Sequence, residues 1–156
     1  MRTVGSRPPN ADQLRILDFL RHPTVPAPVD TNPVARALAA VLLDWDAQAR
    51  CLTVGFTASA EHLQGNGAVH GGVLATMLDF GVAFATLACL APPRVAVTAT
   101  LHLQYERALH APAAVRVQAR VDRLGGRMAF ASALLVGEDA PEDVIARASA
   151  SLALTA

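Results

Sequence analysis

Residues 62–80 read HLQGNGAVHGGVLATMLDF and join a glycine-rich loop directly to a long apolar run. Four glycines fall within residues 65–72, and the apolar run covers residues 71–90 with a single carboxylate, Asp79. An apolar run of this length indicates a helix that is either buried in a protein core or embedded in a bilayer. The flanking sequence decides between these two settings.

The flanking segments favour a buried helix. A carboxylate at the centre of a membrane helix costs about 2.5 to 3.5 kcal/mol, and segments with strand periodicity lie on both sides of the run. The N-terminal sequence has neither the apolar segment nor the cleavage pattern of a secretion signal. We therefore expect a cytoplasmic protein that does not insert into a membrane.

Composition indicates a single globular domain without a nucleic acid partner. The 156 residues include 13 arginines, no lysine and 13 acidic side chains, so the formal net charge is zero. These charges are scattered rather than clustered, which argues against nucleic acid binding. Cys51 and Cys89 lie apart within apolar runs, and we expect them to be buried free thiols.

Upstream of the glycine loop, the sequence predicts a short helix and a hairpin. Asn10 and Gln13 have the spacing of a capping box, and a helical repeat of apolar residues follows that ends by Arg21. A proline-punctuated connection occupies residues 22–33. Residues 39–58 are then expected to form two strands around a polar turn.

Downstream of the apolar run, the pattern changes to that of strands. Within residues 94–105 the apolar side chains are expected on one face: Val95, Val97, Ala99, Leu101, Leu103 and Tyr105. The polar side chains are expected on the other face: Thr98, Thr100, His102 and Gln104. Three more strands are predicted over residues 114–124, 128–136 and 144–154.

Consecutive antiparallel strands and one apolar helix permit few architectures. The sheet must curl around the helix so that both bury apolar surface, which makes the chain an α+β protein. The outer face of the sheet remains to be covered, which favours dimerisation. We assign residues 1–30 to an N-terminal extension that contains the short helix, and residues 31–156 to one folded domain.

The glycine loop does not match the common nucleotide-binding loops. Residues 65–70 approach the pattern G-x-G-x-x-G, but His70 replaces the third glycine and no helices separate the later strands. The absence of lysine excludes a Walker phosphate loop, and no G-x-S-x-G motif supports a serine nucleophile. The histidines lack metal-ligand spacing, so we expect no metal.

The remaining chemical use of the loop is an oxyanion site at the start of the helix. First-turn amides are free donors, and the Gly71 and Gly72 amides would suit a carbonyl oxygen that becomes negatively charged. Asp79 is a candidate general base. It lies roughly 12 Å further along the helix, at 1.5 Å per residue. Both groups can act on one substrate only if two chains pair with antiparallel helices.

The chain resembles hotdog-fold acyl-CoA thioesterases of the phenylacetate-pathway type. The matching residues are Gln64, Gly67, His70, Gly71, Gly72 and Asp79. Residues 95–109 are similar to the strand that follows the central helix in that family. The resemblance implies a hotdog fold, in which a curled antiparallel sheet wraps around one long helix. It also implies hydrolysis of an acyl-CoA ester to the free acid and CoA without a cofactor.

The resemblance implies a role for each matched position. The Gly71 amide would polarise the thioester carbonyl, and Asp79 of the partner subunit would act as a base for water or as the nucleophile. Gln64 stands where the family places a residue that contacts the thioester or the water. Thr98 stands near a position where the family places a residue that orients the carboxylate or the water. Substrate-binding roles are implied for the remaining positions: His70, Gly72, Asn66 and, as a candidate phosphate contact, Arg107.

Several alternatives stay open at this point. Asp79 could be a buried carboxylate satisfied by Thr98 without any chemistry. A non-catalytic acyl-CoA binding or sensing module on the same fold is the second functional hypothesis, and a hydratase is a weaker third. The chain departs from the family at two positions: Thr100 stands where an acidic residue is frequent, and Ala108 stands where proline is usual. Both departures concern the edge of the expected substrate site. The expected assembly is a homodimer, with a homotetramer as the alternative.

Overall fold

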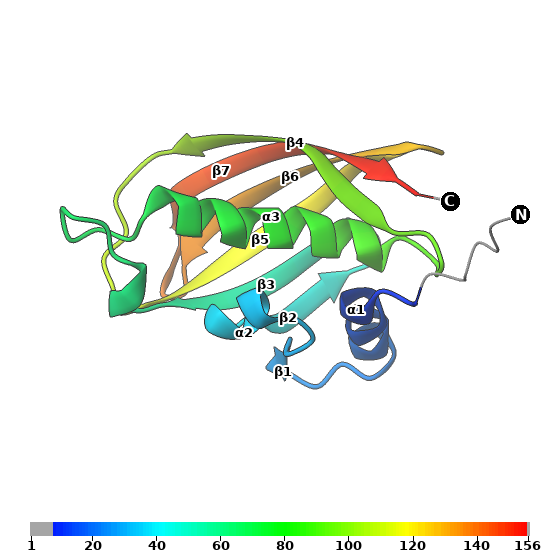
Figure 1. Ribbon diagram of the computed structural model, residues 1–156, viewed down its shortest axis with the longest axis horizontal. Coiled ribbons are helices and arrows are strands. Elements are labelled where there is room, and N and C mark those ends of the chain that lie inside the picture. Colours follow the sequence, from blue (N-terminus) through cyan, green and yellow to red (C-terminus); the bar gives the residue numbers. More distant parts are fainter. Residues whose placement is uncertain (1–7, 156) are drawn as a thin grey trace, which may run out of the picture.

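The computed structural model describes residues 8–155 as an antiparallel sheet curled around one long helix (Figure 1). The helical elements are α1 (Ala11–Arg21), α2 (Pro33–Ala37), a 3₁₀ turn (Ala60–His62) and α3 (Gly71–Ala88). The strands are β1 (Ala27–Pro28), β2 (Val41–Asp46), β3 (Cys51–Ala58), β4 (Ala96–Tyr105), β5 (Ala113–Leu124), β6 (Met128–Gly137) and β7 (Ala140–Leu154). Their order in the sheet is β1-β2-β3-β5-β6-β7-β4. The predicted α+β fold is confirmed.

Helix α3 is the core helix of this fold. By length and hydropathy it is the one helix within residues 8–155 that could cross a membrane. The sheet wraps around one side of it instead, where Met77, Leu78 and Val82 are fully buried. A Cβ atom on Gly81 would lie 2.4 Å from Val117 Cγ1. Glycine at this position therefore allows α3 to approach β5 closely.

Helix α1 begins at the predicted cap and is tied to the far end of α3. The Asn10 side chain accepts a hydrogen bond of 2.9 Å from the Gln13 amide. The Gln13 side chain does not close the capping box, because it is buried and donates to the carbonyl oxygens of Leu90 and Arg94. The N-terminal helix thus packs on the domain, while a boundary near residue 30 stays a prediction.

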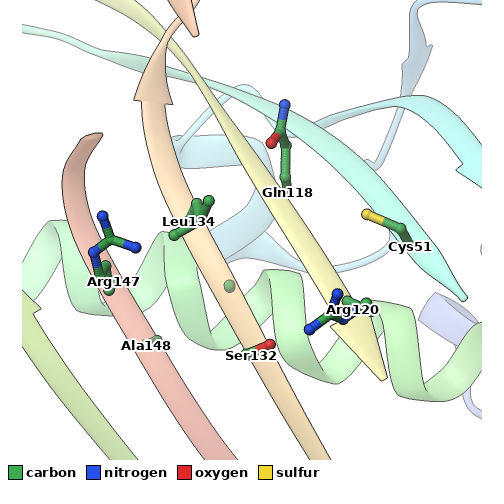
Figure 2. A pocket seen from close by; sticks show the side chains of 8 residues that line it. Cys51, Gln118, Arg120, Ser132, Leu134, Arg147 and Ala148 are labelled. Carbon is green, nitrogen blue, oxygen red and sulfur yellow. The ribbon is translucent and has the colours of Figure 1, made fainter. Parts of the chain in front are cut away.

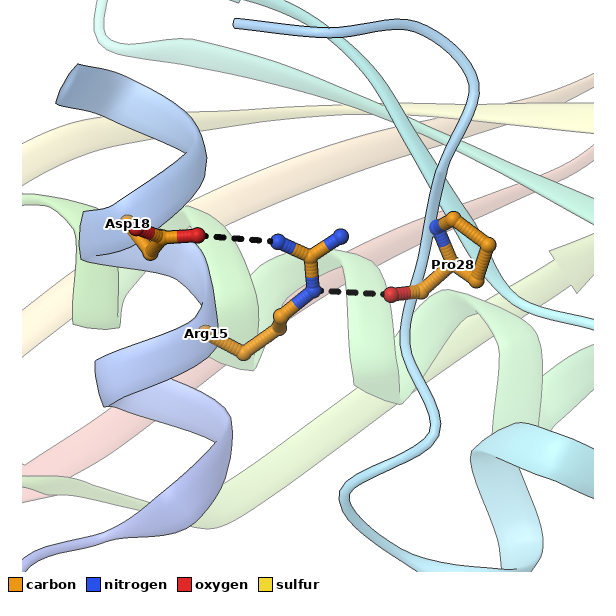
Figure 3. Close-up of polar contacts among 3 residues, drawn as sticks. All are labelled: Arg15, Asp18 and Pro28. Atoms are coloured by element: carbon orange, nitrogen blue, oxygen red, sulfur yellow. Dashed lines mark hydrogen bonds and ion pairs between the residues drawn. The ribbon is translucent and has the colours of Figure 1, made fainter. Parts of the chain in front are cut away.

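The proline-punctuated connection contains two short elements that the sequence pattern does not predict. Strand β1 pairs with β2, and α2 begins after Asn32, whose side chain accepts a hydrogen bond from the Ala35 amide. Arg15 of α1 holds this segment in place (Figure 3). Its Nε donates to the Pro28 carbonyl oxygen at 2.8 Å, and its Nη1 forms an ion pair with Asp18.

Strand β4 departs from regular alternation at Ala99. Thr98 pairs with Leu152 and Thr100 pairs with Ser151, so Ala99 is an extra residue in the ladder between β4 and β7. Such a bulge changes which face the preceding side chains occupy. Val97 is 54% exposed, whereas Thr98 contacts the helix. The prediction of one uninterrupted alternation is therefore wrong for the residues before the bulge.

Candidate active site

The glycine-rich loop is closed at its base by backbone hydrogen bonds. Leu63 and Val69 form an isolated antiparallel bridge, and the His70 amide donates to the His62 carbonyl oxygen at 2.8 Å. Gly67 has a φ angle of +82°, a conformation that favours glycine. The closed loop determines where α3 begins.

Gln64 and Asn66 both lie exposed on this loop. The Asn66 side-chain oxygen accepts a hydrogen bond of 3.1 Å from the Ala68 amide, so Asn66 shapes the loop itself. The Gln64 side chain makes no hydrogen bond within the part of the chain that the structure describes. Of the two predicted contacts, Gln64 is the one whose side chain is available to a ligand.

His70 caps α3 with its imidazole ring. Its Nδ1 accepts a hydrogen bond of 2.8 Å from the Gly72 amide, and a Cβ atom on Gly72 would lie 3.0 Å from that nitrogen. An Nδ1 atom that accepts this bond leaves the proton of the neutral ring on Nε2. The Gly72 amide therefore already has an acceptor within the chain. Of the two glycine amides expected to be free donors, only one remains.

The Gly71 amide is the free donor of the first turn. The amides of Val73 and Leu74 both donate to the His70 carbonyl oxygen, at 2.9 and 3.3 Å, and the Gly72 amide donates to the His70 ring. The Gly71 amide has no acceptor among residues 8–155. It lies at the positive end of the helix dipole, where an oxygen that gains negative charge is stabilised.

Tyr105 covers the carbonyl side of Gly71. Its hydroxyl donates to the Gly71 carbonyl oxygen at 2.8 Å, and a Cβ atom on Gly71 would lie 3.3 Å from the phenol ring. The sequence pattern predicts the face of β4 that carries Tyr105. It does not predict this contact, which joins residues 34 positions apart. Tyr105 is therefore a site residue that sequence reasoning missed.

Asp79 and Thr98 are brought together as the resemblance implies. The Thr98 hydroxyl donates to Asp79 Oδ1 at 2.7 Å, and Asp79 is half-buried on α3. No side chain within residues 8–155 donates to Oδ2. Asp79 lies eight positions after Gly71 on α3, which is roughly 12 Å along the helix. One chain therefore holds both groups and keeps them apart.

Arg107 lies two residues after the end of β4 and is paired with a carboxylate. Its Nη2 lies 2.8 Å from Asp143 Oδ2, and both side chains are about half-exposed. The candidate phosphate contact is thus already occupied by an acidic side chain. An exposed ion pair contributes at most about 1 kcal/mol, so a phosphate group could replace Asp143 at little cost.

A pocket of about 390 Å³ lies on the outer face of the sheet, on the side away from α3 (Figure 2). Its side chains come from β3, β5, β6 and β7: Cys51, Gln118, Arg120, Ser132, Leu134 and Arg147 among them. The Arg120 and Arg147 side chains each form an ion pair, with Asp122 and Glu106 respectively. None of the predicted site residues lines this pocket.

Neither cysteine is suited to act as a nucleophile at neutral pH. Both are free and half-buried, so the expectation of free thiols is confirmed and the burial is partial. Burial raises the pKa of Cys51 and of Cys89 above the ordinary thiol value of 9.0. Within the described residues, no three His, Cys, Asp or Glu side chains gather into a group that could hold a metal ion.

Comparison with known proteins identifies the family. The model of the thioesterase superfamily matches residues 66–143, half of the chain, and this segment includes the start of α3, Asp79 and Thr98. The chain belongs to the thioesterase superfamily. The resemblance to hotdog-fold thioesterases is thereby confirmed, and we assign the chain as a thioester hydrolase.

Individual relatives agree with this assignment. Over 105 residues the chain is 36% identical to a Pseudomonas aeruginosa protein assigned as an esterase, covering 67% of this chain and 78% of that protein. A protein of Ralstonia eutropha JMP134, assigned as a phenylacetic acid degradation-related thioesterase, is similar in structure. It shows 28% identity, a TM-score of 0.76, and coverage of 89% of this chain and 98% of that one. A single-residue variant of the phenylacetic acid degradation protein PaaI from Thermus thermophilus shows 25% identity, a TM-score of 0.68, and coverage of 78% and 98%.

Proposed function

We propose that this chain hydrolyses acyl-CoA thioesters to the free acid and coenzyme A, as a homodimer and without a cofactor. The observation that carries this proposal is the free Gly71 amide at the start of α3 in a chain of the thioesterase superfamily. That amide polarises the thioester carbonyl and stabilises the negative oxygen that forms when the carbon is attacked.

The carboxylate of Asp79 drives the attack. As a general base, Asp79 takes a proton from water while the water oxygen bonds to the carbonyl carbon, and the carbon–sulfur bond then breaks to release the CoA thiolate. As a nucleophile, the carboxylate bonds to the carbonyl carbon, the carbon–sulfur bond breaks to release the CoA thiolate, and water then cleaves the resulting anhydride to the free acid and the regenerated carboxylate. In either route the Thr98 hydroxyl occupies Oδ1 and leaves Oδ2 to face the water or the thioester.

The proposed site requires two chains. Gly71 and Asp79 lie roughly 12 Å apart along the same helix, too far for both to act on one carbonyl group. Two α3 helices related by a two-fold axis and running antiparallel bring Gly71 of one chain near Asp79 of the partner subunit. Each dimer then contains two equivalent sites.

Two surfaces support such pairing. Only half of α3 is buried, although the helix is apolar almost all round, and in Figure 1 its open side faces the viewer. Strand β4 ends the sheet, and no described strand pairs with its outer edge. This edge has ten residues and no Arg, Lys, Asp, Glu or Pro. Long uncharged edges of this kind are otherwise prone to pair with other chains.

The Gly71 donor is tested by comparing Gly71→Pro with Gly71→Ala. Proline at the first helical position is well tolerated and removes the N–H, and His70, with ψ 132°, already has the conformation that precedes proline. Alanine introduces the same crowding against Tyr105 but keeps the N–H. We expect kcat for acyl-CoA esters to be about 10² to 10³ lower in the proline variant than in the alanine variant. Equal kcat values would contradict the proposed donor.

The partner contribution is tested by mixing two inactive variants, Asp79→Asn and Gly71→Pro. Random exchange makes half of the dimers mixed, and each mixed dimer has one intact site of two. Recovery of about one quarter of the wild-type activity is therefore expected. No recovery, with exchange verified by mass spectrometry, would place both groups on one chain. Saturable binding of acyl-CoA without thiol release by the wild type would instead indicate the non-catalytic module.

A further inference from the structure

The end of β4 contacts the oxyanion donor through one side chain. Tyr105 is the only tyrosine of the chain, and its hydroxyl donates to the Gly71 carbonyl oxygen at 2.8 Å. Its ring fills the space in which a side chain at residue 71 would lie, with ring atoms 3.3 Å from the Cβ position. Gly71 thus carries both the free amide and the carbonyl oxygen that the Tyr105 hydroxyl contacts.

The peptide group between Gly71 and Gly72 is held at both of its ends. Its carbonyl oxygen accepts from Tyr105, and its N–H donates to His70 Nδ1 at 2.8 Å. The preceding peptide group is held by helix amides that donate to the His70 carbonyl oxygen. Glycine by itself allows wide rotation about φ and ψ. These contacts on both flanking peptides fix the direction of the Gly71 N–H.

Tyr105 is itself fixed by the neighbouring strand. It pairs with Ala146 in the ladder between β4 and β7. The amides of the next two residues, Glu106 and Arg107, both donate to the Ile145 carbonyl oxygen, at 2.9 and 3.3 Å. The side chains of Glu106 and Arg107 each form an ion pair with a residue of β7. Tyr105 therefore lies at a strand end that these contacts with β7 hold in place.

We infer that Tyr105 is a positioning residue for the Gly71 oxyanion donor, an inference that rests on the proposed function. Tyr105 acts through the Gly71 carbonyl and not on the reacting atoms. Removal of its hydroxyl keeps the donor but releases one of the groups that orient it. A misplacement of about 1 Å in a catalytic group can cost about 10²-fold in rate. Because an oxyanion donor acts mainly in the transition state, the loss falls on kcat rather than KM.

The test compares Tyr105→Phe with the control Thr86→Val. The Thr86 hydroxyl also donates to a carbonyl oxygen of α3, that of Val82, but at the other end of the helix. We expect Tyr105→Phe to lower kcat about 10- to 100-fold with KM within about twofold of wild type, and Thr86→Val to keep wild-type kcat. A kcat for Tyr105→Phe within twofold of wild type, or a loss confined to KM, would overturn the inference.

A second readout separates this inference from the proposed function. The chain has 10 glycines, so labelling with ¹⁵N-glycine gives a simple amide spectrum. In Tyr105→Phe the Gly72 amide proton should move upfield, because its peptide carbonyl loses a donor, and in Thr86→Val it should stay. If wild-type protein hydrolyses no acyl-CoA ester, the proposed function fails. An unmoved Gly72 resonance would overturn the positioning contact whether or not the wild type is active.

Discussion

Thr98 donates its hydroxyl hydrogen to Asp79 Oδ1 over 2.7 Å, and the bulge at Ala99 is what turns Thr98 toward the helix. Without the extra residue, Thr98 would share the outward face of β4 with His102. Bulges commonly redirect a side chain next to an active site. Here the bulge links the edge strand of the sheet to the carboxylate of the central helix and fixes the orientation of that carboxylate.

Loss of the hydrogen bond from Thr98 to Asp79 should lower the turnover rate. A hydrogen bond to a charged group contributes about 1.5 to 3 kcal/mol, so Thr98→Val should reduce kcat about tenfold or more. Thr98→Ser retains the hydroxyl and should stay close to wild type. Steady-state thiol release from an acyl-CoA ester measures both variants. If valine and serine behave alike, the orienting role of the hydroxyl is excluded.

The open edge of β4 should control assembly. His102 lies exposed on this edge strand, and Ser149 is its register partner on β7. His102→Lys places like charges across a junction between two copies of β4. The variant should dissociate at higher concentration and lose activity per chain on dilution, while Ser149→Lys should do neither. Light scattering after size exclusion gives the mass. A dimer of unchanged stability in His102→Lys would argue against pairing through β4.

Close packing of α3 on β5 should make Gly81 intolerant of a side chain. The Cβ of Gly81→Ala would lie 2.4 Å from Val117, and overpacking of this kind costs about 1 to 3 kcal/mol. Gly126→Ala is the control, because no atom lies within 4 Å of its Cβ position. Urea unfolding should show a lower midpoint for Gly81→Ala alone. Equal midpoints would show that α3 can move away from the sheet without loss.

The two thiols should weaken the fold at alkaline pH. Burial raises the pKa of Cys51 and Cys89, so the folded chain keeps these protons to a higher pH than the unfolded chain. Their contribution to stability is complete below pH 9.0 and is lost as the pH rises through the raised values. Urea unfolding at about pH 7.5 and about pH 10.5 should show a smaller alkaline loss for a Cys51→Ala, Cys89→Ala double variant. An equal loss of stability in the wild type and the double variant would show that other groups cause the alkaline destabilisation.

Periodicity predicts most of the fold because each helix or strand that packs on the core must place apolar side chains at the intervals of that element. The apolar run after Gly71 becomes α3, and the alternating segments become β5, β6 and β7 within a few residues of the predicted limits. Asn10 caps α1 because its side chain bonds a local amide. These features depend on neighbours close in sequence, which a pattern can represent.

The details of the candidate site depend on contacts that no local pattern encodes. The bulge at Ala99 follows from the register with β7, and alanine itself carries no signal of it. Whether the Gly72 amide is free depends on the rotamer of His70. The contact between Tyr105 and Gly71 depends on how the strand end meets the helix start. Gly71, Asp79 and Thr98 could be named from sequence, whereas the bulge that turns Thr98 toward Asp79 and the contact of Tyr105 with Gly71 could not.

Strand β4 carries both of those orienting groups, Thr98 near its beginning and Tyr105 at its end. In the proposed dimer, the Tyr105 of a chain supports the donor of one site, and the Thr98 of that chain supports the carboxylate that serves the other site. A shift of β4 along its own axis at one site would therefore displace a supporting side chain at the second. In that dimer, each site would therefore depend on the β4 strands of both chains.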